Sequence, residues 1–246
     1  QKDPPALVEI QVKDGEKIVG EAAGLYNNRV DVPVPDPRLW SPDDPFLYDV
    51  TVILKDSSGT VLDHVDSYAG MRKIEIRNTI VAGKRGNQRQ IKQIYLNNKF
   101  LFQMGPLDQG YWPDGLYTAP TDEALRWDVA KIKEFGYNMV RKHIKIEPAR
   151  WYMWCDKIGL LVWQDMPSIW GIRSEQEETI FERELTDMVR EHWNHPCIIN
   201  WIVFNEHWGL YDVHRLTEHT MALDPSRLVT GNSGIDAGDP DIDYEV

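Results

Sequence analysis

The stretch Cys197-Ile-Ile-Asn-Trp-Ile-Val-Phe-Asn-Glu206 decides the fold. It is a near-continuous apolar run that ends in two polar residues, which is typical of a parallel strand covered on both faces. Similar runs occur at 100–104, 138–143, 160–165 and 228–231, and amphipathic segments separate them. Five successive strand-helix units predict a parallel β/α architecture, which is either doubly wound or a barrel.

The helices between these strands carry their own start and stop signals. Thr121 is suited to cap a helix that runs to Phe135, and Gly136 follows that helix. A second helix opens with Pro148 in its first turn and ends before Gly159. The strand-helix alternation therefore rests on local signals as well as on hydrophobicity.

The first part of the chain predicts only β-structure. Short β-branched segments at 8–12, 48–54 and 61–65 are separated by turn formers, a spacing typical of an immunoglobulin-like sandwich. The proline-rich segment 32–37 must be irregular or at an edge. Only four or five strands are recognisable, fewer than the roughly seven of such a sandwich. We therefore expect an incomplete sandwich over residues 1–82 and a second domain over residues 83–246, with a polar connector between them.

Composition excludes several classes of function. A net charge of −12 without a basic cluster argues against nucleic acid as a partner. No apolar run approaches the roughly 20 residues of a membrane span, and the first five residues do not resemble a signal peptide. The sequence has no glycine-rich phosphate loop, and His192 and His195 lack further metal ligands nearby, so we expect neither cofactor nor metal.

Polar residues follow the predicted strands where ligands bind in both parallel architectures. They are listed here in chain order: Arg141, His143, Gln164, Asp165, Asn205, Glu206 and Asn232. A glutamate that ends an apolar strand has a raised pKa unless it is paired, and a carboxyl that stays protonated near neutral pH is a general acid. Glu206 is therefore the candidate catalytic residue, and the alternative is a structural ion pair with Arg141.

Tryptophans are the second candidate group, because nine of the ten lie after residue 110. Trp112, Trp163 and Trp170 are candidates for stacking on sugar rings. Core packing is the competing interpretation for each of them.

The segment His195-Pro-Cys-Ile-Ile-Asn-Trp-Ile-Val-Phe-Asn-Glu206 resembles a signature of glycoside hydrolase family 2, which includes β-galactosidases, β-glucuronidases and β-mannosidases. Leu39–Tyr48 and Gly70–Ile74 resemble motifs of that family's sandwich domain. Tyr137–Arg141 and Trp151–Asp165 resemble its second and third barrel strands. The resemblance covers the chain from about residue 30.

This resemblance implies a multidomain β plus α/β protein, in which a partial immunoglobulin-like β-sandwich precedes an incomplete (β/α)8 TIM barrel. It implies a retaining β-glycosidase in which Glu206 is the general acid/base, Asn205 binds the sugar 2-hydroxyl and Arg141 holds the nucleophile ionised. The nucleophile of that family lies on the seventh strand, which this chain does not reach, so we expect the chain alone to be inactive.

The remaining expectations concern the substrate and its surroundings. His143 and Asp165 are also candidate substrate-binding residues, although the sequence around both departs from the family pattern, and Asp165 could instead support Arg141. The expected partner is an oligosaccharide or glycoside, with a β-galactoside favoured because that activity is common in the family. We expect export to the periplasm or the extracellular space. The sequence does not decide whether the protein forms a homo-oligomer. The competing interpretations are a non-catalytic carbohydrate-binding or degenerate barrel and a doubly wound cofactor-binding domain.

Overall fold

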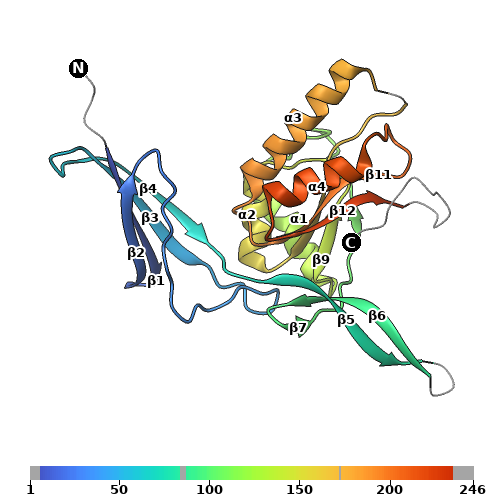
Figure 1. Ribbon diagram of the computed structural model, residues 1–246, viewed down its shortest axis with the longest axis horizontal. Coiled ribbons are helices and arrows are strands. Elements are labelled where there is room, and N and C mark those ends of the chain that lie inside the picture. The colour runs from blue at the N-terminus through green and yellow to red at the C-terminus, as the bar shows by residue number, and fades with distance from the viewer. Residues whose placement is uncertain (1–5, 84–86, 172, 235–246) are drawn as a thin grey trace. The chain divides into compact units, whose positions relative to one another are not determined.

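The computed structural model describes residues 6–83, 87–171 and 173–234. The chain forms two compact units (Figure 1). The first unit contains Gln1–Trp40 and Phe46–Met71, and the second contains Ser41–Pro45 and Arg72–Val246.

The first unit is built on a four-stranded antiparallel sheet in the order β2-β1-β3-β4. Its strands are β1 (Leu7–Asp14), β2 (Lys17–Leu25), β3 (Tyr48–Lys55) and β4 (Val61–Ala69). The register places Ile10 opposite both Ala22 and Val52, which makes one face of the sheet apolar. This is the sandwich-type antiparallel structure that the sequence predicts.

The proline-rich segment packs against β2 without regular structure, as its composition predicts. A Cβ atom on Gly24 would lie 2.8 Å from Val30 Cγ2, and one on Gly20 would lie 2.6 Å from the carbonyl oxygen of Pro33. Because side chains alternate along a strand, Cβ atoms at both positions would point to the same side of β2. Glycine is therefore required at these positions for the close approach of the two segments.

The second unit begins with a small antiparallel sheet made of β5 (Ile74–Ala82), β6 (Gln88–Leu96) and β7 (Lys99–Phe100). The domain boundary predicted between residues 82 and 83 falls between β5 and β6, which pair along their whole length. Shortly before β5, the Arg72 guanidinium donates hydrogen bonds of 2.8–3.1 Å to three backbone carbonyls, those of Pro196, Ile198 and Ser226. Arg72 thereby ties the chain before the hairpin to the segments that lead into the last two strands of the parallel sheet.

In the described part of the chain, a parallel five-stranded sheet and four helices follow this hairpin (Figure 1). The elements, in chain order, are β8 (Leu107–Asp108), α1 (Asp122–Glu134), β9 (Met139–Lys142), α2 (Ala149–Ile158), β10 (Leu161–Asp165), α3 (Glu175–His192), β11 (Ile198–Asn205), α4 (Val213–Leu223) and β12 (Leu228–Ser233). The strand order β12-β11-β10-β9-β8 follows the sequence without a reversal. Because right-handed crossovers in an unreversed order place every helix on the same face, this is the winding of a barrel and not of a doubly wound sheet.

Local sequence explains where these elements begin and end. The Thr121 hydroxyl accepts a hydrogen bond from the Ala124 backbone N–H at 3.1 Å and caps α1, as predicted. Gly159 ends α2 in the left-handed conformation, with φ of 81°. Every residue of β11 is buried, in agreement with its apolar sequence.

The prediction of a buried strand at residues 100–104 is wrong. Residues 101–106 have no regular structure, and the Phe102 side chain is 71% exposed. The first parallel strand is instead the short β8, which pairs with β9 through Leu107 and Asp108. The Gly105 backbone lies so close to the Met139 carbonyl oxygen of β9 that a Cβ atom at this position would clash with it.

None of the helices in the described part of the chain combines the length and the hydropathy that a membrane-spanning helix needs. Among the described residues, no three His, Cys, Asp or Glu side chains are grouped as ligands for a metal ion.

Candidate active site

The carboxyl ends of four neighbouring parallel strands bring together a polar group that we name the strand-end cluster. It consists of Arg141 from β9, Asp165 from β10, Asn205 from β11 and Ser233 from β12. The sequence predicts the first three of these residues. The sequence lists Asn232, the neighbour of Ser233, among the polar residues that follow the strands, and in the structure Ser233 is the residue of β12 that bonds to Arg141.

The two neighbours at the end of β12 have different surroundings. Ser233 pairs with Asn205 in the register, and its Oγ atom lies 2.6 Å from Arg141 Nη2. The Asn232 side chain is buried and makes no hydrogen bond within the described residues. Ser233 therefore joins the strand-end cluster through its bond to Arg141.

Arg141 organises the strand-end cluster. Its Nε and Nη2 atoms donate to the two Asp165 oxygens at 2.9 and 2.7 Å, which is a bidentate ion pair. Nη2 also lies 2.8 Å from Asn205 Oδ1 and 2.6 Å from Ser233 Oγ. One guanidinium thus fixes side chains from three neighbouring strands.

Asp165 is the buried member of the pair, with its side chain only 1% exposed. Burial raises the pKa of Asp165, and the hydrogen bonds and charge of Arg141 counter that rise. The Ile144 backbone N–H adds a third donor at 3.3 Å. Because both carboxylate oxygens are engaged inside the protein, the geometry supports the role of a partner for Arg141.

Glu206 stands directly after β11 and its side chain is exposed to solvent. Its backbone has φ of 54°, a left-handed conformation that is unusual for glutamate. The Glu206 backbone N–H donates to the Ser233 carbonyl at 2.7 Å, and a Cβ on Gly234 would lie 3.1 Å from Glu206 Cγ. The strained turn directs Glu206 out of the sheet, and within the described residues the ion-pair partner of Arg141 is Asp165 and not Glu206.

His143 lies one residue beyond β9 and is buried. Its Nδ1 atom is 3.2 Å from Nε2 of Gln109, which comes from the loop after β8. Sequence reasoning missed Gln109, because a polar residue after a two-residue strand gives no periodic signal.

The loop that carries Trp112 is held by a buried ionic group on the opposite side of β9, which sequence reasoning also missed. Lys142 pairs with Asp108 and with Glu147, and Glu147 in turn pairs with Lys145 at 3.0 Å. Burial alone would lower the pKa of Lys142, but the two carboxylates outweigh it and raise that pKa. Lys145 Nζ donates to the carbonyls of Gly110 and Tyr117 at 2.6 and 3.0 Å, which closes the loop between them.

The structure places the three candidate tryptophans differently. Trp112 is half-buried in that loop. Trp163 lies in β10 on the same side of the strand as Asp165, and its ring N–H donates to Gln103 Oε1 at 2.7 Å. Trp170 is 74% exposed in the loop after β10, and its ring lies against that of Trp208, with centroids 4.3 Å apart.

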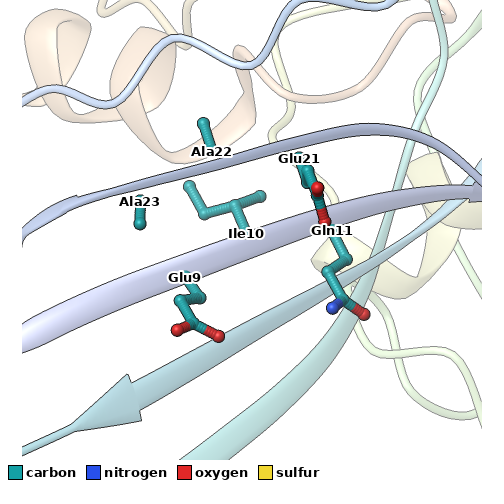
Figure 2. A pocket seen from close by; sticks show the side chains of 6 residues that line it. All are labelled: Glu9, Ile10, Gln11, Glu21, Ala22 and Ala23. Carbon is teal, nitrogen blue, oxygen red and sulfur yellow. The ribbon is translucent and has the colours of Figure 1, made fainter. Parts of the chain in front are cut away.

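A separate hollow of about 350 Å³ lies in the first unit (Figure 2). Its lining is Glu9, Ile10, Gln11, Glu21, Ala22 and Ala23. Glu9 is already paired with Lys55 at 2.5 Å. None of the predicted site residues lines this hollow, so the candidate site remains at the strand ends of the second unit.

The fold and the strand-end cluster define the class of the protein, a β/α barrel whose polar site lies at the carboxyl ends of its strands. Two family models match the chain. One, described as glycosyl hydrolases family 2, matches residues 6–72, and the other, described as glycosyl hydrolases family 2, TIM barrel domain, matches residues 89–244. The chain therefore belongs to glycosyl hydrolases family 2, as its sequence motifs predict.

Similar proteins carry the names of several glycosidases. A β-galactosidase of Lactococcus lactis subsp. lactis is 29% identical, and the match covers 94% of this chain and 22% of that protein. A putative β-glucuronidase of Formosa agariphila is 28% identical over 87% of this chain and 26% of its own length. The structure of an FMN-binding β-glucuronidase from Facaelibacterium prausnitzii superposes with a TM-score of 0.79 and 26% identity, covering 96% of this chain and 36% of that one. The chain thus spans between about a fifth and two fifths of the length of these relatives.

Proposed function

We propose that this chain supplies the acid/base half of the active site of a retaining β-glycosidase, with Glu206 as the general acid/base. The observation that supports this role is the position of Glu206, which is exposed at the end of a fully buried strand beside a fixed polar cluster. A general acid must lie within hydrogen-bond reach of the atom that it protonates, and an exposed carboxyl is accessible to a bound substrate. The Glu206 carboxyl is exposed in this way beside the strand-end cluster.

In the proposed mechanism, Glu206 first donates its proton to the glycosidic oxygen as the leaving group departs. A second carboxylate about 5 Å away forms the glycosyl ester, and Glu206 then removes a proton from the water that hydrolyses it. That nucleophile is not assigned to any residue of this chain. We propose that the positive charge of Arg141 lowers the pKa of that nucleophile.

The other residues bind or position the sugar. We propose that Asn205, held through its Oδ1 by Arg141, directs its amide N–H groups towards the sugar 2-hydroxyl. Asp165 acts by positioning Arg141. His143, Trp112, Trp163 and Trp170 are the further proposed contacts to the substrate.

The proposed partner is a β-linked oligosaccharide or glycoside, with β-galactosides as the first class to test. The β-galactosidase names among the relatives support this choice. The β-glucuronidase names make glucuronides the second class.

The test compares the wild type with Glu206→Gln in the full-length protein that contains this chain. Substrates are β-galactosides and β-glucuronides with poor leaving groups, because their cleavage depends on proton donation. We expect the variant to lose at least about 100-fold in kcat on the sugar that the wild type hydrolyses. Glu218→Gln is the matched control, since Glu218 is an exposed glutamate on α4 whose side chain is 67% accessible.

Two results would contradict the proposal. Equal turnover by wild type and Glu206→Gln would exclude Glu206 as the acid. A folded protein that binds sugars but hydrolyses none of them would support a non-catalytic carbohydrate-binding barrel instead.

A further inference from the structure

Two tryptophans from different loops form a stacked pair near the end of β11. Trp170 comes from the loop between β10 and α3, and Trp208 from the turn between β11 and α4. Their ring planes are inclined by 32°. Trp208 is half-buried, and Trp170 leaves most of its side-chain surface in solvent.

The two loops are fastened to each other by polar contacts. Ser168 Oγ donates to the Trp208 carbonyl at 2.7 Å, and Arg173 Nη2 donates to Ser168 Oγ at 3.0 Å. Arg173 also donates to the Gly209 carbonyl, and its guanidinium carbon lies 4.2 Å from the Phe181 ring centroid. The pair is therefore held as a preformed platform, which lowers the conformational entropy lost on binding.

The turn after β11 connects this platform to the proposed acid. The Trp208 backbone N–H donates to the Asn205 carbonyl at 3.2 Å, so Glu206 and Trp208 belong to one turn. Asn205, the proposed contact to the glycone sugar, is buried, whereas the Trp170 side chain is 74% exposed. A substrate seated over Asn205 would extend its leaving group towards Trp170.

We propose that Trp170 and Trp208 form a subsite for the leaving group of the substrate, and that this subsite takes a second pyranose ring. This inference rests on the proposed function. The apolar face of a pyranose fits an exposed aromatic face, because stacking removes apolar surface from water without burying hydroxyl groups. An acyclic leaving group would gain nothing from the platform.

The test is a leaving-group series on the full-length protein that contains this chain, with one glycone throughout. A disaccharide is compared with a trifluoroethyl glycoside, whose alcohol has an acidity similar to that of a sugar hydroxyl but no ring, and with an aryl glycoside. We expect Trp170→Ala to lower kcat/KM for the disaccharide by about 10-fold and to leave the trifluoroethyl glycoside unchanged within about twofold. Trp170→Phe should retain most of the disaccharide activity, and Trp127→Ala, at a tryptophan on α1 that is 59% exposed, should change neither substrate.

Three outcomes would overturn the inference. Equal losses on the disaccharide and the trifluoroethyl glycoside would show that Trp170 only maintains the structure. No loss on any substrate would show that the leaving group does not reach the platform. A loss confined to the aryl glycoside would assign the subsite to aromatic leaving groups instead of a pyranose. Glu206→Gln separates this inference from the proposed function, because full turnover by that variant would refute the acid role whatever the Trp170 variants show.

Discussion

Replacing Arg141 with methionine would leave the Asp165 carboxylate buried without its counter-charge. The change removes two hydrogen bonds of 2.9 and 2.7 Å from a side chain that is 1% exposed. Breaking a buried ion pair in this way costs about 3–5 kcal/mol. The lower end of that range applies here, because Ile144 still donates to Asp165 and the Arg141 side chain is 20% exposed in the native pair. Ser233 Oγ and Asn205 Oδ1 lie 3.3 Å apart and can bond to each other. The loss of their hydrogen bonds from Arg141 therefore adds little to the free-energy cost of the substitution.

The pH dependence of that cost follows from the same contacts. Burial already raises the pKa of Asp165, and without Arg141 that pKa rises further. A carboxyl whose folded pKa exceeds its unfolded pKa binds a proton more readily in the folded state, so stability increases as the pH falls through the folded pKa. The destabilisation by Arg141→Met should therefore shrink as the pH is lowered from 7 towards the unfolded pKa of about 3.9.

A double-mutant cycle in urea tests this account. Tryptophan fluorescence is the readout, because nine of the ten tryptophans lie after residue 110 and report on the second unit. Arg141→Met should cost about 3 kcal/mol at neutral pH, and the further change Asp165→Asn, which removes the buried charge, should recover about half of it. Two results would refute the buried-pair argument. One is a loss of less than about 1 kcal/mol in the free energy of unfolding of Arg141→Met. The other is a loss in the double variant that equals the sum of the losses in the two single variants within about 0.5 kcal/mol.

Two further predictions concern the body of the second unit. Burial lowers the pKa of His192, so the folded state resists protonation, and the free energy of unfolding should fall as the pH drops below the unfolded pKa of about 6.5. His192→Leu should flatten this pH dependence, which urea titrations at several pH values would measure. An unchanged dependence in the variant would contradict the prediction. Arg72→Met removes the hydrogen bonds to three backbone carbonyls and should lower the thermal midpoint by the equivalent of about 2 kcal/mol. Arg72→Lys should recover part of that loss in the same calorimetric scan, and full stability of Arg72→Met would exclude a structural role for these bonds.

The sequence predicts the fold wherever hydrophobicity and local capping agree. The apolar run of β11 and the Thr121 cap of α1 were read correctly because burial and capping leave direct marks on residue type. The run at residues 100–104 carries the same mark and misled the prediction, since Phe102 is exposed in the structure. Periodicity cannot distinguish a buried strand from an apolar connection whose course is fixed by a close backbone approach at Gly105.

For the site, too, the sequence indicates where residues lie along the chain but not which residues they contact. Residues after strand ends can be found from sequence, because parallel strands deliver their carboxyl ends to one edge. Which of two neighbours bonds to the site depends on side-chain geometry at the strand end, and sequence alone does not distinguish Ser233 from Asn232. The buried pairs of Lys142 join residues of three different segments, and single-sequence reasoning has no signal for such contacts.

The turn after β11 is held by contacts that bear on the proposed role of Glu206. Arg141 is paired with Asp165, and the Glu206 carboxyl is exposed to solvent beside the cluster. The left-handed backbone of Glu206 is unfavourable by itself, and the hydrogen bond from its N–H to the Ser233 carbonyl helps to hold it. Asp165 and Arg141 hold each other through both carboxylate oxygens, so the cluster beside Glu206 keeps its geometry without using the Glu206 carboxyl.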